Sequence, residues 1–153
     1  MVTAFSVNAQ KASQTVTSLL NSYYEVKNAL VYSDVSTASV KADEFIKTSN
    51  SVDMNAIPAD KMNAFMFLLK KLVSGAEHIA TATDIKKQRD YFADFSLDFY
   101  SLAKMVKLTD QPVYQAYCSM KKMYWLSNEK TIKNPYYGKM MLTCGSITET
   151  INP

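Results

Sequence analysis

Apolar or small residues recur at alternating steps of three and four along most of the first 108 residues. This spacing puts each set on one face of a helix, and it suits helices that pack at shallow angles in a bundle. The pattern therefore predicts an all-α fold, an up-down four-helix bundle. The four faces comprise Val16, Leu19, Tyr23, Val26 and Leu30; Val35, Ala38, Ala42 and Phe45; Met62, Phe65, Leu69, Leu72, Ala76 and Ile79; and Ile85, Phe92, Phe95, Phe99, Leu102 and Val106, with Gln88 as the one polar interruption.

Residues that start or end helices stand between these four segments. Asp34 can cap the second helix and Asp84 the fourth. Pro58 follows the polar stretch 50–57 and suits the first turn of the third helix. Gly75 lies inside the third segment, where its low helix propensity costs about 1 kcal/mol. Because the links are short, neighbouring helices are expected to be antiparallel.

The helical pattern stops near residue 108, and the tail, residues 109–153, is predicted to be irregular. Two aromatic-rich pieces within it, 114–120 and 123–126, are candidates for short extended segments. The length of 153 residues is near the common size of one domain. We therefore expect residues 13–153 to form a single domain in which the tail closes one end or side of the bundle.

The first nine residues, MVTAFSVNA, fall outside the helical pattern. Val7-Asn8-Ala9 before Gln10 resembles the small-residue end of a signal-peptidase site, although no basic region precedes it. We interpret residues 1–12 as the clipped remnant of an export signal, with a disordered N-terminus as the alternative. Export would place the chain in the periplasm or another oxidising compartment, where disulfides persist.

Composition narrows the classes of function. Seventeen basic and fourteen acidic residues give a weak net charge of +3, and Arg89 is the only arginine. Bidentate recognition of phosphates or bases, and with it nucleic-acid binding, is therefore not expected. No apolar run approaches the roughly 18 residues of a membrane span. His78 is the only histidine, and no nucleophile elbow, P-loop or dinucleotide fingerprint is present, so we do not expect an enzyme.

Two charged residues on the predicted helices have structural interpretations. His78 is expected to be a partly exposed histidine of the bundle, with a supporting metal ligand as the alternative. Arg89 is expected to hold helices together through an ion pair. Its candidate carboxylate partners are Asp90, Asp94 and Glu25. An anion-binding role for Arg89 is an alternative that nothing in the sequence supports.

Soft sulfur donors are concentrated in one segment of the tail, CSMKKMYWLSNEKTIKNPYYGKMMLTCG. It holds both cysteines, the only tryptophan and four of the nine methionines. Thiolates and thioethers suit Cu(I) or Ag(I), whereas the spacing matches no zinc pattern. We expect the two cysteines to lie close together, with the indole and some of the methionines around them. The candidate metal-binding residues are Cys118, Met120, Met123, Trp125, Met140, Met141 and Cys144. The alternative is a loop stapled by a Cys118–Cys144 disulfide that binds no metal.

The same segment resembles domain-of-unknown-function family 3347, an exported bacterial family. That family's pattern reads Cys-Pro-Met, Trp-Leu-Ser, Asn-Pro-Tyr-aromatic-Gly and Met-Leu-x-Cys-Gly. The likeness extends upstream to Tyr23-Tyr24 and Gln88-Arg89, so that it covers about residues 14–151. Two departures are Ser119, where the family has proline, and the basic pair Lys121-Lys122, where it is apolar or contains glycine.

This resemblance implies a periplasmic helical bundle that occurs alone or fused to copper/silver efflux adaptors. Two non-enzymatic functions stay open. One is Cu(I) or Ag(I) binding linked to metal efflux or homeostasis, with an efflux adaptor or another periplasmic metal-handling protein as partner. The other is an interaction module of an efflux system whose cysteines form a disulfide and bind no metal. The sequence does not decide the oligomeric state.

Overall fold

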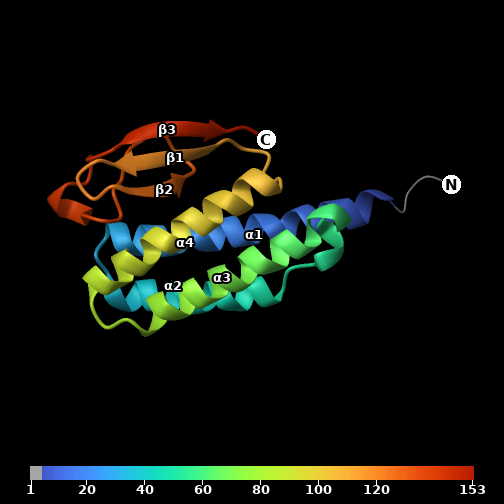
Figure 1. Ribbon diagram of the computed structural model, residues 1–153, viewed down its shortest axis with the longest axis horizontal. Helices are drawn as coiled ribbons and strands as arrows, with labels where there is room; N and C mark the ends of the chain where they lie inside the picture. The colour runs from blue at the N-terminus through green and yellow to red at the C-terminus, as the bar shows by residue number, and fades with distance from the viewer. Residues whose placement is uncertain (1–4) are drawn as a thin grey trace.

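The computed structural model describes residues 5–153, with side chains from Val16 onward. Its main body is the predicted bundle, in which each helix packs against the next one in sequence (Figure 1). Two 3-10 turns, η1 (Met54–Ala56) and η2 (Ala59–Lys61), link the second and third helices. The helices are α1 (Phe5–Val31), α2 (Val35–Asn50), α3 (Met62–Thr81) and α4 (Ile85–Met105).

Part of the predicted export-signal remnant, residues 1–12, lies outside the residues that the structure describes. Residues 1–4 of the proposed signal remnant are not among the described residues, and from Phe5 the backbone is already part of α1. No helix in residues 5–153 combines the length and the apolar character that crossing a bilayer requires.

The prediction of an all-α fold is wrong in one respect, because the tail forms a small sheet. Three antiparallel strands lie in the order β2-β1-β3. Two of the strands coincide with the extended pieces expected from the sequence, but the third was missed. Its sequence, SITETI, has only two apolar residues, and its pairing with the first strand joins positions 29 to 38 residues apart, a contact that local pattern does not reveal. The strands are β1 (Val113–Cys118), β2 (Met123–Ser127) and β3 (Ser146–Ile151).

The predicted helix caps are confirmed. The Asp34 side chain accepts a hydrogen bond from the backbone N–H of Thr37 at 2.9 Å. Asp84 does the same for Lys87 at 2.9 Å. Each cap satisfies one of the backbone donors that a helix start leaves unpaired. Pro58 precedes the turn η2 and not α3 itself, so the third helix begins slightly later than expected.

The apolar helix faces meet in an aromatic core. The Tyr23 ring stacks on Phe92 at 5.5 Å and on Phe95 at 5.7 Å between ring centroids, and it contacts Phe99 at 4.7 Å. Phe45 meets Phe95 edge-on at 4.9 Å. All five side chains are buried. Rings of α1, α2 and α4 therefore lock together, as the three-four spacing predicts.

Gly75 has a packing reason for standing inside α3. A Cβ atom added there would lie 3.2 Å from Cδ2 of Phe95, so glycine lets α3 approach α4 closely. The helix continues through this position. Close packing thus offsets the low helix propensity that glycine brings.

The sheet lies along one side of the bundle, over α4 and α1, while α2 and α3 occupy the other side (Figure 1). The Tyr23 hydroxyl of α1 accepts a hydrogen bond from the Leu126 N–H of β2 at 2.9 Å, and it pairs with Ser96 Oγ of α4 at 2.7 Å. Ala116, Trp125 and Leu126 are fully buried against the helices. The tail therefore closes a side of the bundle and completes its core.

Candidate functional site

The two cysteines lie together at one end of the sheet. Cys118 is the last residue of β1, and Cys144 precedes β3 by two positions. Because these strands are antiparallel neighbours with Tyr117 opposite Ser146, the end of one meets the start of the other. The two Sγ atoms are 3.8 Å apart. The prediction that the cysteines are close in space is confirmed.

Both cysteines are free thiols, Cys118 buried and Cys144 half-buried. Burial raises the pKa of the Cys144 thiol, and the neighbouring Cys118 thiol raises it further. A metal that binds here must therefore displace a proton, since thiolate is the ligand form. A disulfide has an S–S bond of about 2.05 Å, so its formation would require the two sulfurs to move toward each other.

Trp125 packs directly against the chain beside Cys144. A Cβ atom added to Gly145 would lie 2.7 Å from Cη2 of the indole, and Gly145 has a φ of +146°, so only glycine fits there. Trp125 also meets Tyr136 edge-on, with ring centroids 6.1 Å apart. The indole is 1% exposed and forms a wall of the bundle core next to the cysteine pair.

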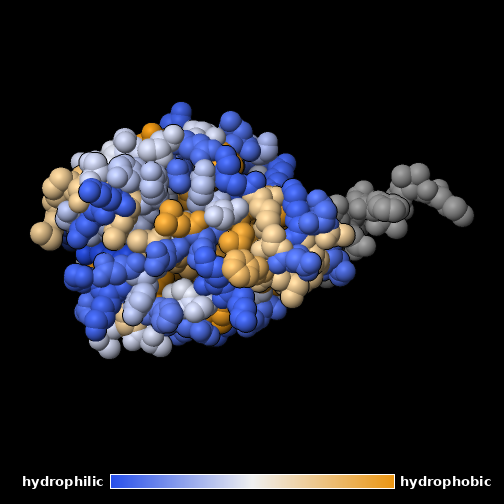
Figure 2. Space-filling view, in the orientation of Figure 1, coloured by the Kyte–Doolittle hydropathy of each residue, from blue (hydrophilic) through white to orange (hydrophobic). Residues whose placement is uncertain are grey.

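The four methionines of the tail differ in their relation to the cysteines. Met123 stands directly opposite Cys118 in the β1–β2 ladder. Side chains opposite each other in an antiparallel pair share a face of the sheet, with Cβ atoms about 4.5–5.5 Å apart. Met120 and Met140, in contrast, are 63% and 85% exposed, and Met141 is also exposed. They belong to turns at the surface, and apolar side chains gather over the turn before β3 in Figure 2.

A third ligand for a metal bound by Cys118 and Cys144 would have to be the sulfur of a methionine. Within residues 16–153, no group of three or more histidine, cysteine, aspartate or glutamate side chains is placed to hold a metal ion. Of the candidates from the sequence, the structure brings together Cys118, Cys144, Met123 and Trp125. It leaves Met120, Met140 and Met141 on the surface.

Asn134 fixes the loop that carries Cys144, a role that was not expected from the sequence. Its fully buried side chain donates to the Cys144 carbonyl at 2.7 Å and accepts from the Tyr136 N–H at 2.8 Å. Its backbone N–H donates to the Leu142 carbonyl at 2.7 Å. One side chain thus connects both ends of the loop.

Arg89 does not form the predicted ion pair. Its Nε donates to the Pro135 carbonyl at 2.7 Å, and its Nη2 donates to the Leu30 carbonyl at 3.0 Å and to Ser33 Oγ at 2.9 Å. Leu30 is in the last turn of α1, where carbonyls lack helical partners. Arg89 therefore ties α4 to the α1–α2 link and to the tail through carbonyl oxygens. Burial lowers the pKa of its guanidinium.

Residues 19–111 match the family model described as "Protein of unknown function (DUF3347)", which is more than half of the chain. The chain belongs to the DUF3347 family. The matched part includes Tyr23 and Arg89, and it ends before β1, so the cysteines of this DUF3347 chain lie beyond it. No curated protein and no solved structure matches the chain.

His78 of this DUF3347 chain is exposed on α3, as predicted. Its ring stacks on Tyr91 of α4 with centroids 5.0 Å apart. The contact gives this histidine a packing role between two helices.

Lys27 is a buried charge that the sequence analysis missed. It is 1% exposed on α1, and its Nζ lies 5.5 Å from the ring centroid of Tyr24. Burial lowers the pKa of Lys27 to about 8; the charge of Glu129 acts in the opposite direction and that of Lys133 in the same direction. The apolar face of α1 passes through Val26 and Leu30. Lys27 stands beside this face and not on it, so its burial could have been expected only if the buried face were known to be wider.

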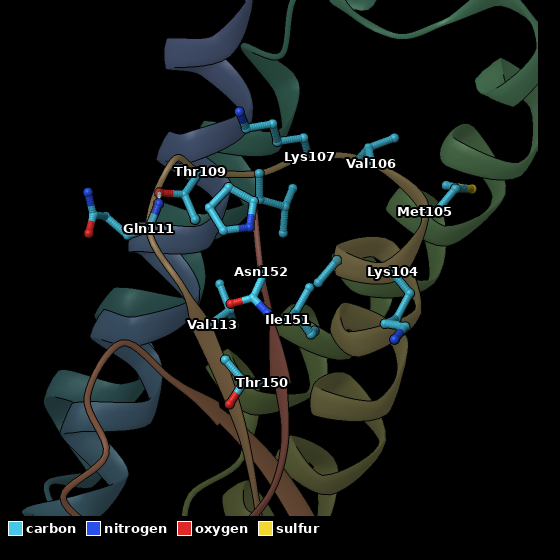
Figure 3. Close-up of a pocket in the computed structure, with 13 residues that line it drawn as sticks. Lys104, Met105, Val106, Lys107, Thr109, Gln111, Val113, Thr150, Ile151 and Asn152 are labelled. Carbon is cyan, nitrogen blue, oxygen red and sulfur yellow. Dashed lines mark hydrogen bonds between the residues drawn. The ribbon is translucent and has the colours of Figure 1, made fainter.

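A cavity of 320 Å³ lies between the end of α4, the link to β1 and the end of β3 (Figure 3). Its two lysines are engaged elsewhere: Lys104 bonds to Glu149, and Lys107 pairs with Asp110 at 2.6 Å. Its lining, from residues 103–113 and 150–153, includes neither cysteine. We therefore do not assign the candidate metal site to this cavity.

Proposed function

We propose that this DUF3347 protein is a non-enzymatic binder of a soft monovalent cation, Cu(I) or Ag(I), with the thiolates of Cys118 and Cys144 as its main ligands. The observation that supports this most is the 3.8 Å separation of the two Sγ atoms. With metal–sulfur bonds of about 2.3 Å, as in zinc thiolates, a shared cation at that separation subtends an angle of about 110°, whereas linear coordination needs about 4.6 Å. The geometry suits a site with at least one further donor.

Met123 is the donor best placed to complete the site. It shares a sheet face with Cys118, and a thioether is a neutral, soft ligand that Cu(I) and Ag(I) accept. Trp125 closes the site on the core side. Met120, Met140 and Met141 are exposed, so the turns that carry them must fold over the pair before these methionines can coordinate. Zinc should bind poorly, because the segment supplies no histidine.

The donor set is tested by silver titration of the reduced protein. Met123→Leu removes the third donor while keeping a similar apolar volume. Met66→Leu, at an exposed position on α3, is the matched control. We expect Ag(I) affinity to fall at least tenfold in the first variant and to stay unchanged in the second. Equal affinities in the two variants would remove Met123 from the site without affecting the cysteine pair.

The second candidate function is an interaction module with a Cys118–Cys144 disulfide and no metal. The same sulfur separation favours it, since only a small approach of the two sulfurs is needed. Closing this loop would stabilise the tail by about 3 kcal/mol on a chain-entropy basis. Thiol counting on protein purified without reductant, together with metal analysis, distinguishes the two: two free thiols with bound metal favour the first function, and no free thiol favours the second.

The proposal also includes a cellular location and a binding partner for the protein. We place the protein in the periplasm or another exported compartment, with an efflux adaptor or another metal-handling protein as its partner. The support is the family resemblance and the soft-donor pair. Fractionation of cells with an antibody to the protein tests the location; recovery of the chain in the cytoplasmic fraction alone would contradict it.

A further inference from the structure

A second cavity, of 250 Å³, lies between the first turns of α4, the β1–β2 turn and the segment that precedes β3. Much of its wall is apolar or aromatic. The apolar and aromatic contributors are Ile85, Met123, Tyr136, Tyr137 and Met140. A concave, mostly apolar site with a few polar groups is the usual form of a small-molecule site.

The charged groups of this cavity are mainly positive: Lys86, Arg89 and Lys121 against the single carboxylate of Asp90. Lys86 and Asp90 pair with each other at 2.7 Å. Arg89 uses its Nε and Nη2 to hold the fold. Within the described residues, neither its Nη1 nor the ammonium of Lys121 has an acceptor. Lys121 Nζ instead lies 5.0 Å from the ring centroid of Tyr137.

We propose that this cavity binds a small organic anion, a carboxylate with an apolar body. The carboxylate would accept charge-assisted hydrogen bonds from Arg89 Nη1 and Lys121 Nζ, which are stronger than bonds between neutral groups. The apolar body would pack against Met123 and the ring of Tyr137. The Met140 thioether serves here as packing surface, whereas Met123, opposite Cys118, lines both this cavity and the proposed metal site. This site does not depend on metal binding at the cysteine pair.

The test is a nuclear magnetic resonance titration of metal-free, reduced protein with ¹³C-labelled methionine methyl groups. Benzoate is the probe, benzamide its uncharged counterpart and inorganic phosphate the anion without an apolar body. We expect benzoate to shift the methyl signals of Met123 and Met140 and to leave those of Met66 and Met105 unchanged. Benzamide and phosphate should each bind at least tenfold more weakly.

Two variants separate the local charge from the net charge of the protein. Lys121→Gln should weaken benzoate binding about tenfold. Lys139→Gln makes the same change of net charge at an exposed residue outside the cavity lining and should have no effect. The proposal is overturned if benzoate shifts neither methyl signal, if benzamide or phosphate binds as tightly as benzoate, or if both variants weaken binding equally. A protein that binds benzoate but no Cu(I) would refute the metal proposal and leave this one standing.

Discussion

Replacing Lys27 with methionine should stabilise the protein at neutral pH and remove a pH dependence from its stability. Lys27 is 1% exposed, so its charged form loses most of its hydration on folding. The charges that act on it are Glu129, which favours the ammonium form, and Lys133, which opposes it. Methionine has a similar length and no charge, so it can fill the same space.

The magnitude follows from the pKa shift. Burial lowers the pKa of Lys27 from 10.5 to about 8. At about 1.4 kcal/mol per pK unit, this corresponds to a destabilisation of about 3 kcal/mol at pH 7. Between pH 8 and 10.5 the unfolded chain binds more protons than the folded one, so the free energy of unfolding rises with pH. Below pH 8 both states are protonated and the whole cost is present.

Urea unfolding at pH 7, 8, 9 and 9.5 measures this effect. Burial raises the pKa of Tyr23 and Tyr24, and their ionisation in the unfolded chain would lower stability above pH 10, so the series stops before that. Relative to Lys27→Met, wild type should gain about 1.6 kcal/mol between pH 8 and 9.5. The comparison is made between the two proteins because burial also raises the pKa of the Cys144 thiol, which affects the stability of both equally in this range. The exposed Lys70→Met is the control and should behave as wild type. A stability difference between wild type and Lys27→Met that does not change with pH, or a Lys27→Met variant that is less stable at pH 7, would contradict the cost assigned to burying Lys27.

Three further variants test the packing, each by urea unfolding. Phe95→Ala should lose about 3–5 kcal/mol because it opens a cavity among four rings; a loss below about 1 kcal/mol would contradict the aromatic core. Gly138→Ala should lose more than about 1 kcal/mol, since Gly138 has a φ of +57° and the new Cβ would lie 2.6 Å from Ser33 Oγ; unchanged stability would refute that contact. Arg89→Met should lose about 2–4 kcal/mol because the Pro135 carbonyl loses the Arg89 donor and the Leu30 carbonyl keeps only the Ser33 N–H, whereas the exposed Lys86→Met should change little. An Arg89→Met variant that kept full stability but lost ligand binding would reverse the assigned role.

Much of the bundle could be predicted because its signals are local. The three-four spacing around Phe95 and the caps at Asp34 and Asp84 depend on residues within a few positions of one another, and all three features are confirmed. Gly75 seemed to weaken α3, yet its role is a contact with another helix. Contacts between helices are set by the fold and cannot be obtained from the composition of one segment.

The sequence indicated which residues of the tail could bind a metal, but it did not indicate how the tail folds. The concentration of sulfur correctly predicted that Cys118 and Cys144 meet. The ladder that brings them together pairs β1 with β3, a strand without a clear alternating pattern. For the same reason the sequence could not distinguish Met123, opposite Cys118, from the exposed Met140. The carbonyl partners of Arg89 were missed because backbone acceptors leave no mark in a sequence.

A Cu(I) competition titration decides whether Cys118 and Cys144 form a soft-metal site. A chromogenic Cu(I) chelator competes with reduced, anaerobic wild type and with the Cys118→Ser/Cys144→Ser double variant. Circular dichroism first checks that both proteins are folded. We expect wild type to withdraw one equivalent of Cu(I) from the chelator and the double variant to withdraw none. Equal and negligible uptake by both proteins would contradict the claim.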